Sequence, residues 1–259
     1  MFYVKGFHYK ESDLLGSGTF GKVYKAFNPD TKQSSAIKKI EHGQRGSKQE
    51  LEIFQKLQSI ENENLIKLID FDIHGDSMFL ILELGDLTLK EYLIEHDHLK
   101  EHVVHQFFRD IANGLRALKN ANIIHRDIKP ENILLCNKKS LPTPAPKDYV
   151  VKLADFGTSR FLQLGELAQT FCGTITYMAP EIQLRKRYNN SADLWSTGLL
   201  LLRCIAGADC FLHTISVMED DLATFFLEYE NSAKSLPLHF NSDCEISNGL
   251  KKIIEGLLI

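Results

Sequence analysis

The sequence predicts an α+β fold built from two lobes, a small β-rich lobe followed by a larger and mostly helical one. Two observations predict it. Up to Glu83 the apolar residues fall in short β-rich runs with room for only one long helix, and from Leu87 onward they recur at helical spacing. We therefore place one lobe at about residues 1–84 and the other at about 87–259, joined by a hinge at about 84–86.

Each predicted element has its own local pattern. In the first lobe we expect a turn at Gly16–Gly21, strands at Val23–Phe27, Ser35–Ile40 and Met78–Leu82, and a helix at Ser47–Ile60. In the second we expect helices at Leu87–His96, Val103–Asn120 and Leu250–Leu258, and short strands at Ile133–Leu135 and Val150–Leu153. Asn137–Asp148, which holds three prolines, is expected to be a surface excursion between these two strands.

The composition is that of a globular chain. Its 259 residues are 44% apolar and 25% charged, with 30 Lys and Arg against 34 Asp and Glu, which excludes a disordered or fibrous protein. A net charge of −4 does not indicate nucleic acid as the main partner. The N-terminal residues lack the pattern of a secretory signal, and no apolar run approaches the ~20 residues of a membrane span. The five cysteines are odd in number and include no Cys-x-x-Cys pair, so neither a disulfide framework nor a zinc ribbon is indicated. We expect a cytoplasmic protein without an integral membrane segment.

The glycine-rich stretch Gly16-Ser17-Gly18-Thr19-Phe20-Gly21 is a candidate phosphate-binding loop. Without side chains, its backbone N–H groups can approach phosphate oxygens closely. Alone, the stretch is equally typical of a tight hairpin turn. A dinucleotide-binding fold is disfavoured, because the chain continues as an alternating strand after the last glycine instead of opening a helix.

Lys38 lies inside an apolar strand, where an ammonium group is costly unless it meets an anion. The expected partner is a carboxylate on the following helix. Glu50 is favoured over Glu52, because its register leaves Phe54, one turn later, facing the core.

Three ordered strings carry the strongest signal: His125-Arg126-Asp127-Ile128-Lys129-Pro130-Glu131-Asn132, Asp155-Phe156-Gly157 and Ala179-Pro180-Glu181. With these strings the sequence resembles the eukaryotic protein kinases over essentially its whole length. The resemblance implies a bilobal kinase fold and transfer of the γ-phosphate of ATP to protein substrates, with ATP and Mg²⁺ as cofactors.

The resemblance also implies the catalytic residues. Lys38 would hold the α- and β-phosphates, oriented by Glu50; Asn132 and Asp155 would bind Mg²⁺; Asp127 would accept the proton of the substrate hydroxyl; and Lys129 would neutralise the γ-phosphate. The implied ATP site further includes Leu15, Gly16, Gly18, Gly21, Val23, Ala36, Leu82, Glu83, Leu84, Gly85 and Leu134. In it Val23, Ala36 and Leu134 would sandwich adenine, and backbone groups of Glu83 and Gly85 would hydrogen-bond to it.

Further implied features concern regulation and substrate. Thr170 would be an activation-loop phosphosite whose phosphate pairs with Arg126 and Arg160; the alternative is an unmodified surface threonine. Thr174 and Glu131 would seat the substrate, and Thr174 indicates the serine/threonine branch. Phe54, Leu68, His125 and Phe156 would form the stacked column that links the lobes.

Other strings resemble the autophagy-initiating serine/threonine kinases in particular. They are Asp13-Leu14-Leu15-Gly16, Asn132-Ile133-Leu134-Leu135 with the insert after it, Val151-Lys152-Leu153-Ala154-Asp155-Phe156-Gly157, Thr170-Phe171-Cys172-Gly173, Tyr177-Met178-Ala179-Pro180-Glu181 and Ala192-Asp193-Leu194-Trp195-Ser196. This resemblance implies autophagy-related regulatory proteins as partners.

Two other functions stay open beside an active kinase. One is a catalytically weak, kinase-like nucleotide-binding scaffold; the other is a small-molecule phosphotransferase, disfavoured by the Thr174 and Ala-Pro-Glu segment.

Because the chain stops at Ile259, before a final helix whose arginine would meet Glu181, we expect Glu181 to be buried without a cation. We also expect Leu250, Ile253, Ile254 and Leu257 to form the apolar face of the last helix. His98, His102 and His105 are expected on a solvated face rather than around a metal.

Overall fold

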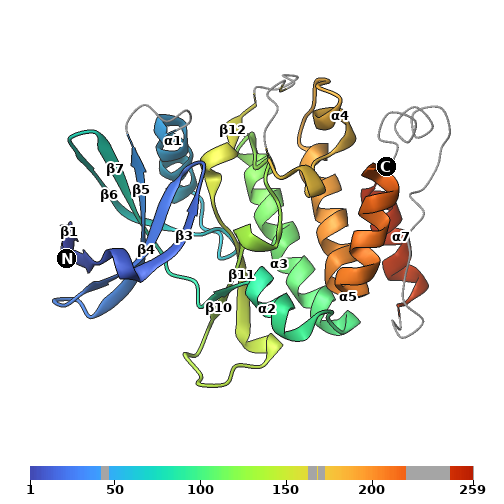
Figure 1. Ribbon diagram of the computed structural model, residues 1–259, viewed down its shortest axis with the longest axis horizontal. Helices are drawn as coiled ribbons and strands as arrows, with labels where there is room; N and C mark the ends of the chain where they lie inside the picture. The colour runs from blue at the N-terminus through green and yellow to red at the C-terminus, as the bar shows by residue number, and fades with distance from the viewer. Residues whose placement is uncertain (42–46, 163–167, 169–172, 220–245, 259) are drawn as a thin grey trace.

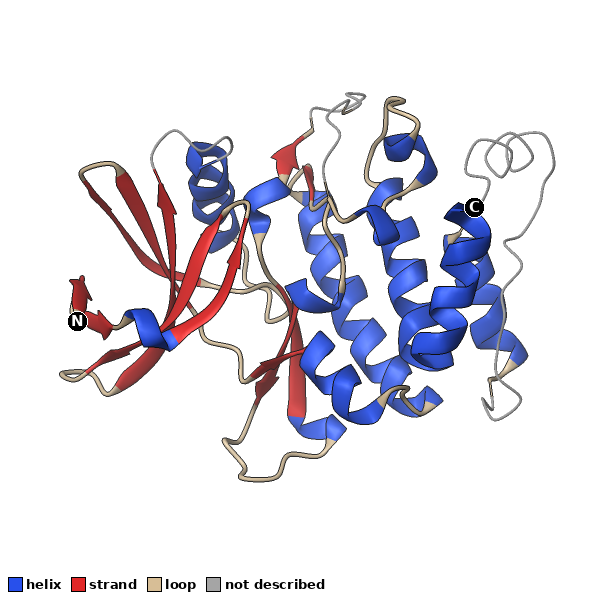
Figure 2. Ribbon diagram, in the orientation of Figure 1, coloured by secondary structure: helices blue, strands red, loops and turns tan. Residues whose placement is uncertain are grey.

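The computed structural model describes residues 1–41, 47–162, 168, 173–219 and 246–258. A β-rich part and a helical part lie side by side, with the N-terminus in the first and the C-terminus in the second (Figure 1). Most strands lie in the first part and most helices in the second (Figure 2), so the predicted α+β class is confirmed.

The elements of the β-rich part are β1 (Phe2–Val4), β2 (Phe7–Tyr9), β3 (Leu14–Gly18), β4 (Gly21–Asn28), β5 (Gln33–Glu41), α1 (Ser47–Gln58), β6 (Leu68–His74) and β7 (Ser77–Leu82). The helical part contains β8 (Leu87–Thr88), α2 (Leu89–His96), α3 (Glu101–Asn120), β9 (Ile123–Ile124), β10 (Ile133–Asn137), β11 (Tyr149–Leu153), β12 (Arg160–Phe161), α4 (Pro180–Gln183), α5 (Ser191–Glu219) and α7 (Asn248–Leu257). Short 3₁₀ turns are η1 (Glu11–Asp13), η2 (Pro130–Asn132), η3 (Pro146–Asp148), η4 (Phe156–Thr158) and η5 (Ile175–Tyr177).

The N-terminal sheet is antiparallel, in the order β1-β2-β4-β5-β7-β6, with β3 paired to β4. Its register places Val23 opposite Lys38, and Lys38 opposite Leu80. Directly opposed residues of paired strands share a face, so Lys38 shares the face of two apolar residues. The side-chain alternation of a strand thus aims the lysine into the interior of the molecule.

Helix α1 packs against β6 of the sheet and against η4 and β12 of the helical part, and its Ile53, Phe54 and Leu57 are at most 6% exposed. The helix ends at Gln58, two residues before the predicted end. There Ser59 and Ile60 close a tight turn onto the carbonyls of Lys56 and Leu57. Packing of one apolar face, more than helix propensity, holds such a short helix.

A connecting segment, residues 83–86, joins β7 to β8. The Glu83 N–H donates to the Lys67 carbonyl (2.9 Å), and the Asp86 N–H donates to the Leu135 carbonyl (3.0 Å). The segment is therefore fixed at one end to the strand side and at the other to the helical part. Its residues coincide closely with the change in periodicity in the sequence.

Strands β10 and β11 form the predicted hairpin around the Pro-rich excursion. Leu134 pairs with Lys152, and Asn137 pairs with Tyr149. The excursion is mostly exposed and closes on Asp148, whose carbonyl accepts from the Lys138 N–H at 2.9 Å. Proline rigidity and these contacts define its path over the surface.

Helix α5 is the central helix of the second part. Leu199, Leu200, Leu201 and Leu202 are all 0% exposed, and Gly207 breaks the helix with a φ of +79°. The stretch Ser191–Leu212 is long and apolar enough to cross a membrane by composition, but 78% of its most apolar window is buried within the fold. A core helix passes the same test, so this stretch is weak grounds for a membrane span.

Two expectations about the C-terminal region are wrong. Ile253 is 47% exposed, and Leu258 is buried in its place beside Leu250 and Ile254, because α7 docks on α5 with a face rotated from the one predicted. Glu181 is only half-buried. It lies in the first turn of α4, where a carboxylate is favoured, and no ion pair of its side chain is found among the described residues. It does not carry the full desolvation penalty that was expected.

The docking of α7 predicts opposite effects for two glycine substitutions. A Cβ at Gly198 of α5 would lie 2.9 Å from Leu258 Cδ2 and 3.0 Å from Leu257 Cβ, whereas a Cβ at Gly256 of α7 meets no atom within 4 Å. Gly198→Ala should lower the free energy of unfolding by about 1–3 kcal/mol through overpacking. Gly256→Ala should leave it unchanged or raise it by up to about 1 kcal/mol through helix propensity. Urea midpoints measure both, and equal shifts in the two variants would contradict the α5–α7 packing.

Candidate functional site

Lys38 meets two carboxylates from distant parts of the chain. Its Nζ lies 2.7 Å from Glu50 Oε1 on α1 and 2.6 Å from Asp155 Oδ1 after β11. The Lys38 and Glu50 side chains are 5% and 2% exposed, while the Asp155 side chain is 38% exposed. Glu50 is thus the carboxylate that the sequence assigned to Lys38, and Asp155 is a second partner that no pairing argument from sequence supplied.

The buried charges shift one another's pKa values. Burial alone would lower the pKa of Lys38, but Glu50 and Asp155 outweigh it and raise the pKa to about 12. Burial raises the pKa of Glu50 to about 7 against the attraction of Lys38. Burial would also raise the pKa of Asp155, but Lys38 and the Gly157 N–H outweigh it and hold this pKa below its ordinary value. Asp155 therefore stays ionised and faces solvent next to a fixed cation.

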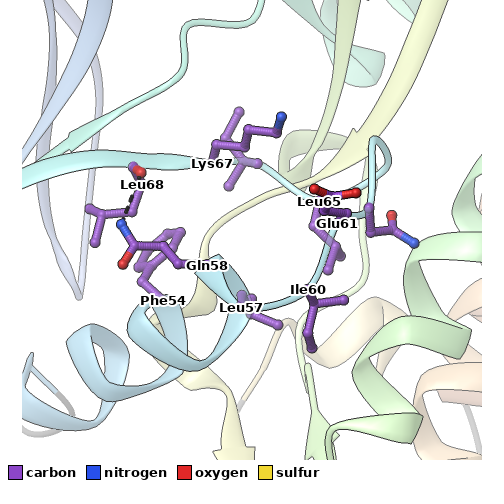
Figure 3. A pocket seen from close by; sticks show the side chains of 10 residues that line it. Phe54, Leu57, Gln58, Ile60, Glu61, Leu65, Lys67 and Leu68 are labelled. Carbon is purple, nitrogen blue, oxygen red and sulfur yellow. Dashed lines mark hydrogen bonds between the residues drawn. The ribbon is translucent and has the colours of Figure 1, made fainter.

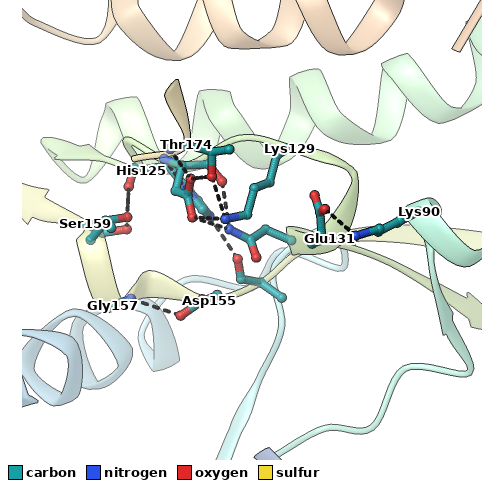
Figure 4. Close-up of polar contacts among 12 residues, drawn as sticks. Lys90, His125, Lys129, Glu131, Asp155, Gly157, Ser159 and Thr174 are labelled. Carbon is teal, nitrogen blue, oxygen red and sulfur yellow. Dashed lines mark hydrogen bonds and ion pairs between the residues drawn. The ribbon is translucent and has the colours of Figure 1, made fainter. Parts of the chain in front are cut away.

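A second cluster surrounds Asp127. Its Oδ1 accepts from the Thr174 N–H (3.0 Å) and from Thr174 Oγ1 (2.8 Å), and its Oδ2 accepts from Asn132 Nδ2 (2.9 Å) and lies 2.7 Å from Lys129 Nζ. Lys129 Nζ also donates to Thr174 Oγ1 at 2.7 Å. Figure 4 shows Lys129 and Thr174 converging in this cluster. Both carboxylate oxygens are held by donors, so the orientation of Asp127 is fixed.

The segment that carries Asp127 is anchored by a residue that the motif analysis did not single out for this role. Asp193, which is 3% exposed near the start of α5, accepts from the His125 N–H and the Arg126 N–H, both at 2.8 Å. Burial raises its pKa against these donors. Arg126 has a φ of +72°, a strained conformation for a non-glycine residue. The available signal was an aspartate two residues into a helix whose middle is strongly apolar.

The glycine-rich loop, residues 16–21, comprises the end of β3, a turn at Thr19 and Phe20, and the first residue of β4. A Cβ at Gly16 or Gly18 would meet no atom of the described residues within 4 Å, so this part of the loop faces open space. Gly21 has a φ of +122°, and a Cβ there would collide with the Lys39 carbonyl. At Gly157 a Cβ would lie 2.8 Å from the Phe20 ring. The loop tip is therefore packed directly against the Asp-Phe-Gly segment.

The residues expected around adenine lie where the sheet meets the connecting segment. Ala36 and Leu82 are directly paired on β5 and β7 and are each 8% exposed, and Val23 and Leu134 are half-buried. A Cβ at Gly85 would lie 3.0 Å from Leu134 Cβ. Leu15, at the entrance to the loop, is 55% exposed. The structure thus places apolar side chains from both parts of the chain at the connecting segment.

Asn132 and Asp155 fit a divalent cation with oxygen preference. Asn132 Nδ2 donates to the Asp127 carbonyl (2.8 Å) and to Asp127 Oδ2, which leaves the amide oxygen as the group for a ligand. A carboxylate and an amide oxygen are ligands that Mg²⁺ prefers, completed by water and phosphate oxygens. No group of three or more His, Cys, Asp or Glu side chains able to hold a metal occurs in the described part of the chain. His98, His102 and His105 are exposed, as expected.

The aromatic members of the predicted column are in contact. The rings of Phe54 and Phe156 are 5.2 Å apart and perpendicular, and those of His125 and Phe156 are 5.3 Å apart. Phe54 and Leu68 also line a cavity of about 220 Å³ at the end of α1 (Figure 3). Across it Gln58 Nε2 donates to the Leu68 carbonyl at 3.3 Å. The column thus couples α1 to the Asp155 segment through packed rings.

The remaining predicted site residues are more dispersed. Thr170 lies outside the described residues. The Arg126 guanidinium donates to the Thr158 carbonyl and, at 3.3 Å, to the Tyr188 hydroxyl. Glu131 forms an exposed ion pair with Lys90 at 3.0 Å (Figure 4). Arg160 is half-buried on β12.

Comparison with known proteins gives a consistent result. The family model "Protein kinase domain" matches residues 9–259. The serine/threonine-protein kinase unc-51 of Caenorhabditis elegans is 38% identical over 216 residues, which cover 80% of this chain and 25% of that protein. The human serine/threonine-protein kinase ULK1 is 33% identical over 261 residues, covering 98% of this chain and 24% of that protein.

A third relative, the serine/threonine-protein kinase atg1 of Dictyostelium discoideum, is 30% identical over 243 residues, covering 89% of this chain and 34% of that protein. The chain therefore spans between about a quarter and a third of the length of these curated relatives. The match to the family model nonetheless covers nearly every residue, including both charged clusters. On this match and the geometry of the site, the chain belongs to the protein kinase domain family.

Proposed function

We propose that this chain is a serine/threonine protein kinase that transfers the γ-phosphate of ATP to a Ser or Thr hydroxyl of a protein substrate. The observation that carries the proposal is the pair of charged clusters, Lys38 with Glu50 and Asp155, and Asp127 with Lys129 and Thr174. Phosphoryl transfer requires mainly positioning and charge neutralisation, and these clusters supply fixed charges of both signs.

In the proposed reaction each residue has one task. Lys38, oriented by Glu50, neutralises the α- and β-phosphates, and Lys129 neutralises the γ-phosphate. Asp127 accepts the proton of the substrate hydroxyl while the oxygen of that hydroxyl bonds to the γ-phosphorus. The bond between the γ-phosphorus and the β–γ bridging oxygen breaks at the same time, which releases ADP. Asn132 and Asp155 would hold Mg²⁺, which when bound neutralises phosphate charge.

The Asp127 cluster supports a hydroxyl as acceptor. The Thr174 hydroxyl donates to Asp127 Oδ1 at 2.8 Å while it accepts from Lys129, which is the set of contacts that a substrate hydroxyl needs. Within the described residues, the hydrogen bonds and the ion pair of the Asp127 carboxylate all come from donors, so a substrate hydroxyl takes its place by displacing one of them. The hydroxyl of Thr174, an alcohol like that of a Ser or Thr substrate, already satisfies these distances in the site.

A role in autophagy initiation is a further proposal. It is supported by the resemblance of the sequence strings to the autophagy-initiating kinases and by relatives named unc-51, ULK1 and atg1. The proposed partners are protein substrates and autophagy-related regulatory proteins, and the proposed location is the cytoplasm. Glu131 is proposed to seat substrate only after its ion pair with Lys90 opens.

The test of kinase activity is radiolabelled-ATP transfer to generic protein substrates. Lys38→Met and Asp155→Asn should each lower turnover by on the order of a hundredfold or more, because each removes a charge that acts on the reacting phosphates. Lys39→Met is the matched control, since Lys39 is the next residue on β5 and pairs with Glu41 instead (2.9 Å). Nucleotide binding without transfer in the parent chain would favour the scaffold alternative.

The role of Thr174 can be tested with two substitutions. Thr174→Val keeps the shape but removes the hydroxyl that joins Asp127 to Lys129, so we expect kcat to fall about tenfold or more. Thr174→Ser keeps the hydroxyl and should retain most of the activity. If valine and serine at this position gave the same kcat, the hydroxyl contact would have no part in turnover.

Phosphorylation of Thr170 is the proposed activating modification. A phosphate adds up to about −2 charge and three acceptor oxygens, which Arg126 and Arg160 could pair with. Thr170→Ala should lower activity, and Thr170→Glu should restore only part of it, because a carboxylate has less charge and fewer acceptors. Thr143→Ala, in the exposed excursion, is the control. Peptide mapping of fully active protein that found no phosphate on Thr170 would overturn the proposal.

A further inference from the structure

The connecting segment 83–86 has free hydrogen-bonding groups in its middle. The N–H groups of Glu83 and Asp86 are occupied by Lys67 and Leu135. Among the described residues, no hydrogen bond is made by the Glu83 carbonyl or by either backbone group of Gly85. These groups lie beside Leu134, which approaches Gly85 closely. Every backbone offers the same N–H donors and carbonyl acceptors, so the ligand that these groups can bind depends on where they lie and in which direction they point.

One ion pair joins this segment to β11 of the helical part. Lys152 Nζ on β11 lies 3.0 Å from Glu83 Oε2, with side chains 7% and 32% exposed. Lys152 is directly opposite Leu134 in the β10–β11 hairpin, so the two side chains share a face. The lysine therefore links β11, which is paired with the strand that carries Leu134, to the connecting segment.

Lys152 needs this partner more than a surface lysine would. A buried ammonium is costly without an anion, and Glu83 is the only carboxylate with which Lys152 forms an ion pair in the part of the chain that the structure describes. Glu83 is held at a second point by its N–H bond to the Lys67 carbonyl. Two contacts, the ion pair of its side chain and the bond of its N–H, therefore restrain Glu83 next to its free carbonyl.

We propose that Lys152 is a positioning residue for the nucleotide base: its ion pair with Glu83 sets the direction in which the connecting segment presents its free backbone groups. The inference rests on the proposed ATP-dependent activity and deepens it by naming a residue that acts on the adenine end alone. Lys152 is not among the residues proposed to hold the phosphates or the substrate hydroxyl. Its loss should therefore affect base binding and leave the chemical step intact.

The experiment measures base affinity apart from turnover. In the full chain, Lys152→Met should raise the KM for ATP and the Kd of adenosine by a similar factor, about fivefold, the size of one hydrogen bond's net contribution. The kcat and the KM for a peptide substrate should stay within about twofold of the parent. Lys152→Arg, which keeps the charge, should restore most of the affinity, and Lys147→Met, an exposed lysine of η3, should change nothing.

A double substitution separates positioning from a merely structural role. Lys152→Leu with Glu83→Leu replaces both charges by apolar groups and restores a stable fold without an unpaired charge. We expect its thermal midpoint to approach that of the parent while adenosine affinity stays low. Recovery of both would show that Lys152 serves the fold only and would overturn the inference. An unchanged adenosine Kd in Lys152→Met would also overturn it.

The same measurements distinguish this inference from the proposed function. A parent chain that binds adenosine and transfers phosphate, with a Lys152→Met variant that binds adenosine equally well, contradicts the inference alone. A parent chain that binds neither adenosine nor ATP contradicts the proposed activity, and the inference falls with it. A parent that binds adenosine but does not transfer phosphate still tests the inference through the Kd.

Discussion

The burial of one positive charge organises this molecule. Lys38 lies on an interior strand and is compatible with the fold only because Glu50 from α1 and Asp155 from the end of β11 reach it. A buried ammonium without these carboxylates would cost several kcal/mol. The ion pairs therefore join the sheet, the helix beside it and the helical part of the chain. The position of α1 and the charge state of Asp155 both follow from this contact.

A second buried carboxylate, that of Asp193, holds a segment of the backbone in place. Asp193 accepts from two successive N–H groups, those of His125 and Arg126, and so holds a strained segment directly before Asp127. Packing alone explains neither Lys38 nor Asp193, since burying an apolar side chain at either position would cost less free energy than burying a charged one. Lys38 fixes the position of Asp155, whose side chain is partly exposed, and Asp193 fixes the backbone that leads to Asp127. This is how a stable core can position a polar site at its edge.

Packing connects the two charged clusters. Phe156 follows Asp155 in the chain and contacts both Phe54 of α1 and His125 of the Asp127 segment. A shift of α1 would be felt at Phe156 because close-packed rings have few alternative arrangements. The connecting segment gives a comparable link on the other side, where Lys152 and Glu83 join β11 to the end of β7. In addition to the ion pair of Lys38 with Asp155, the aromatic contact of Phe54 with Phe156 and the ionic contact of Lys152 with Glu83 thus join segments at two sides of the site.

The sequence by itself determined the local features of this protein. Periodicity located α1, α3 and the β10–β11 hairpin to within a few residues, because side-chain alternation and helical spacing are set by neighbours in the chain. Register on a single strand and helix also sufficed to choose Glu50 as the partner of Lys38.

Only the tertiary structure decided the contacts between distant segments. The second partner of Lys38 is 117 residues away, and the anchor of His125 is 68 residues away; no local pattern encodes such distances. The docked face of α7 shows the same limit, with Leu258 buried and Ile253 exposed. Several faces of an apolar helix can satisfy its own periodicity, and the surface of α5 selects one. Likewise Glu181 is half-buried, not buried, because the depth of a side chain depends on what packs over it.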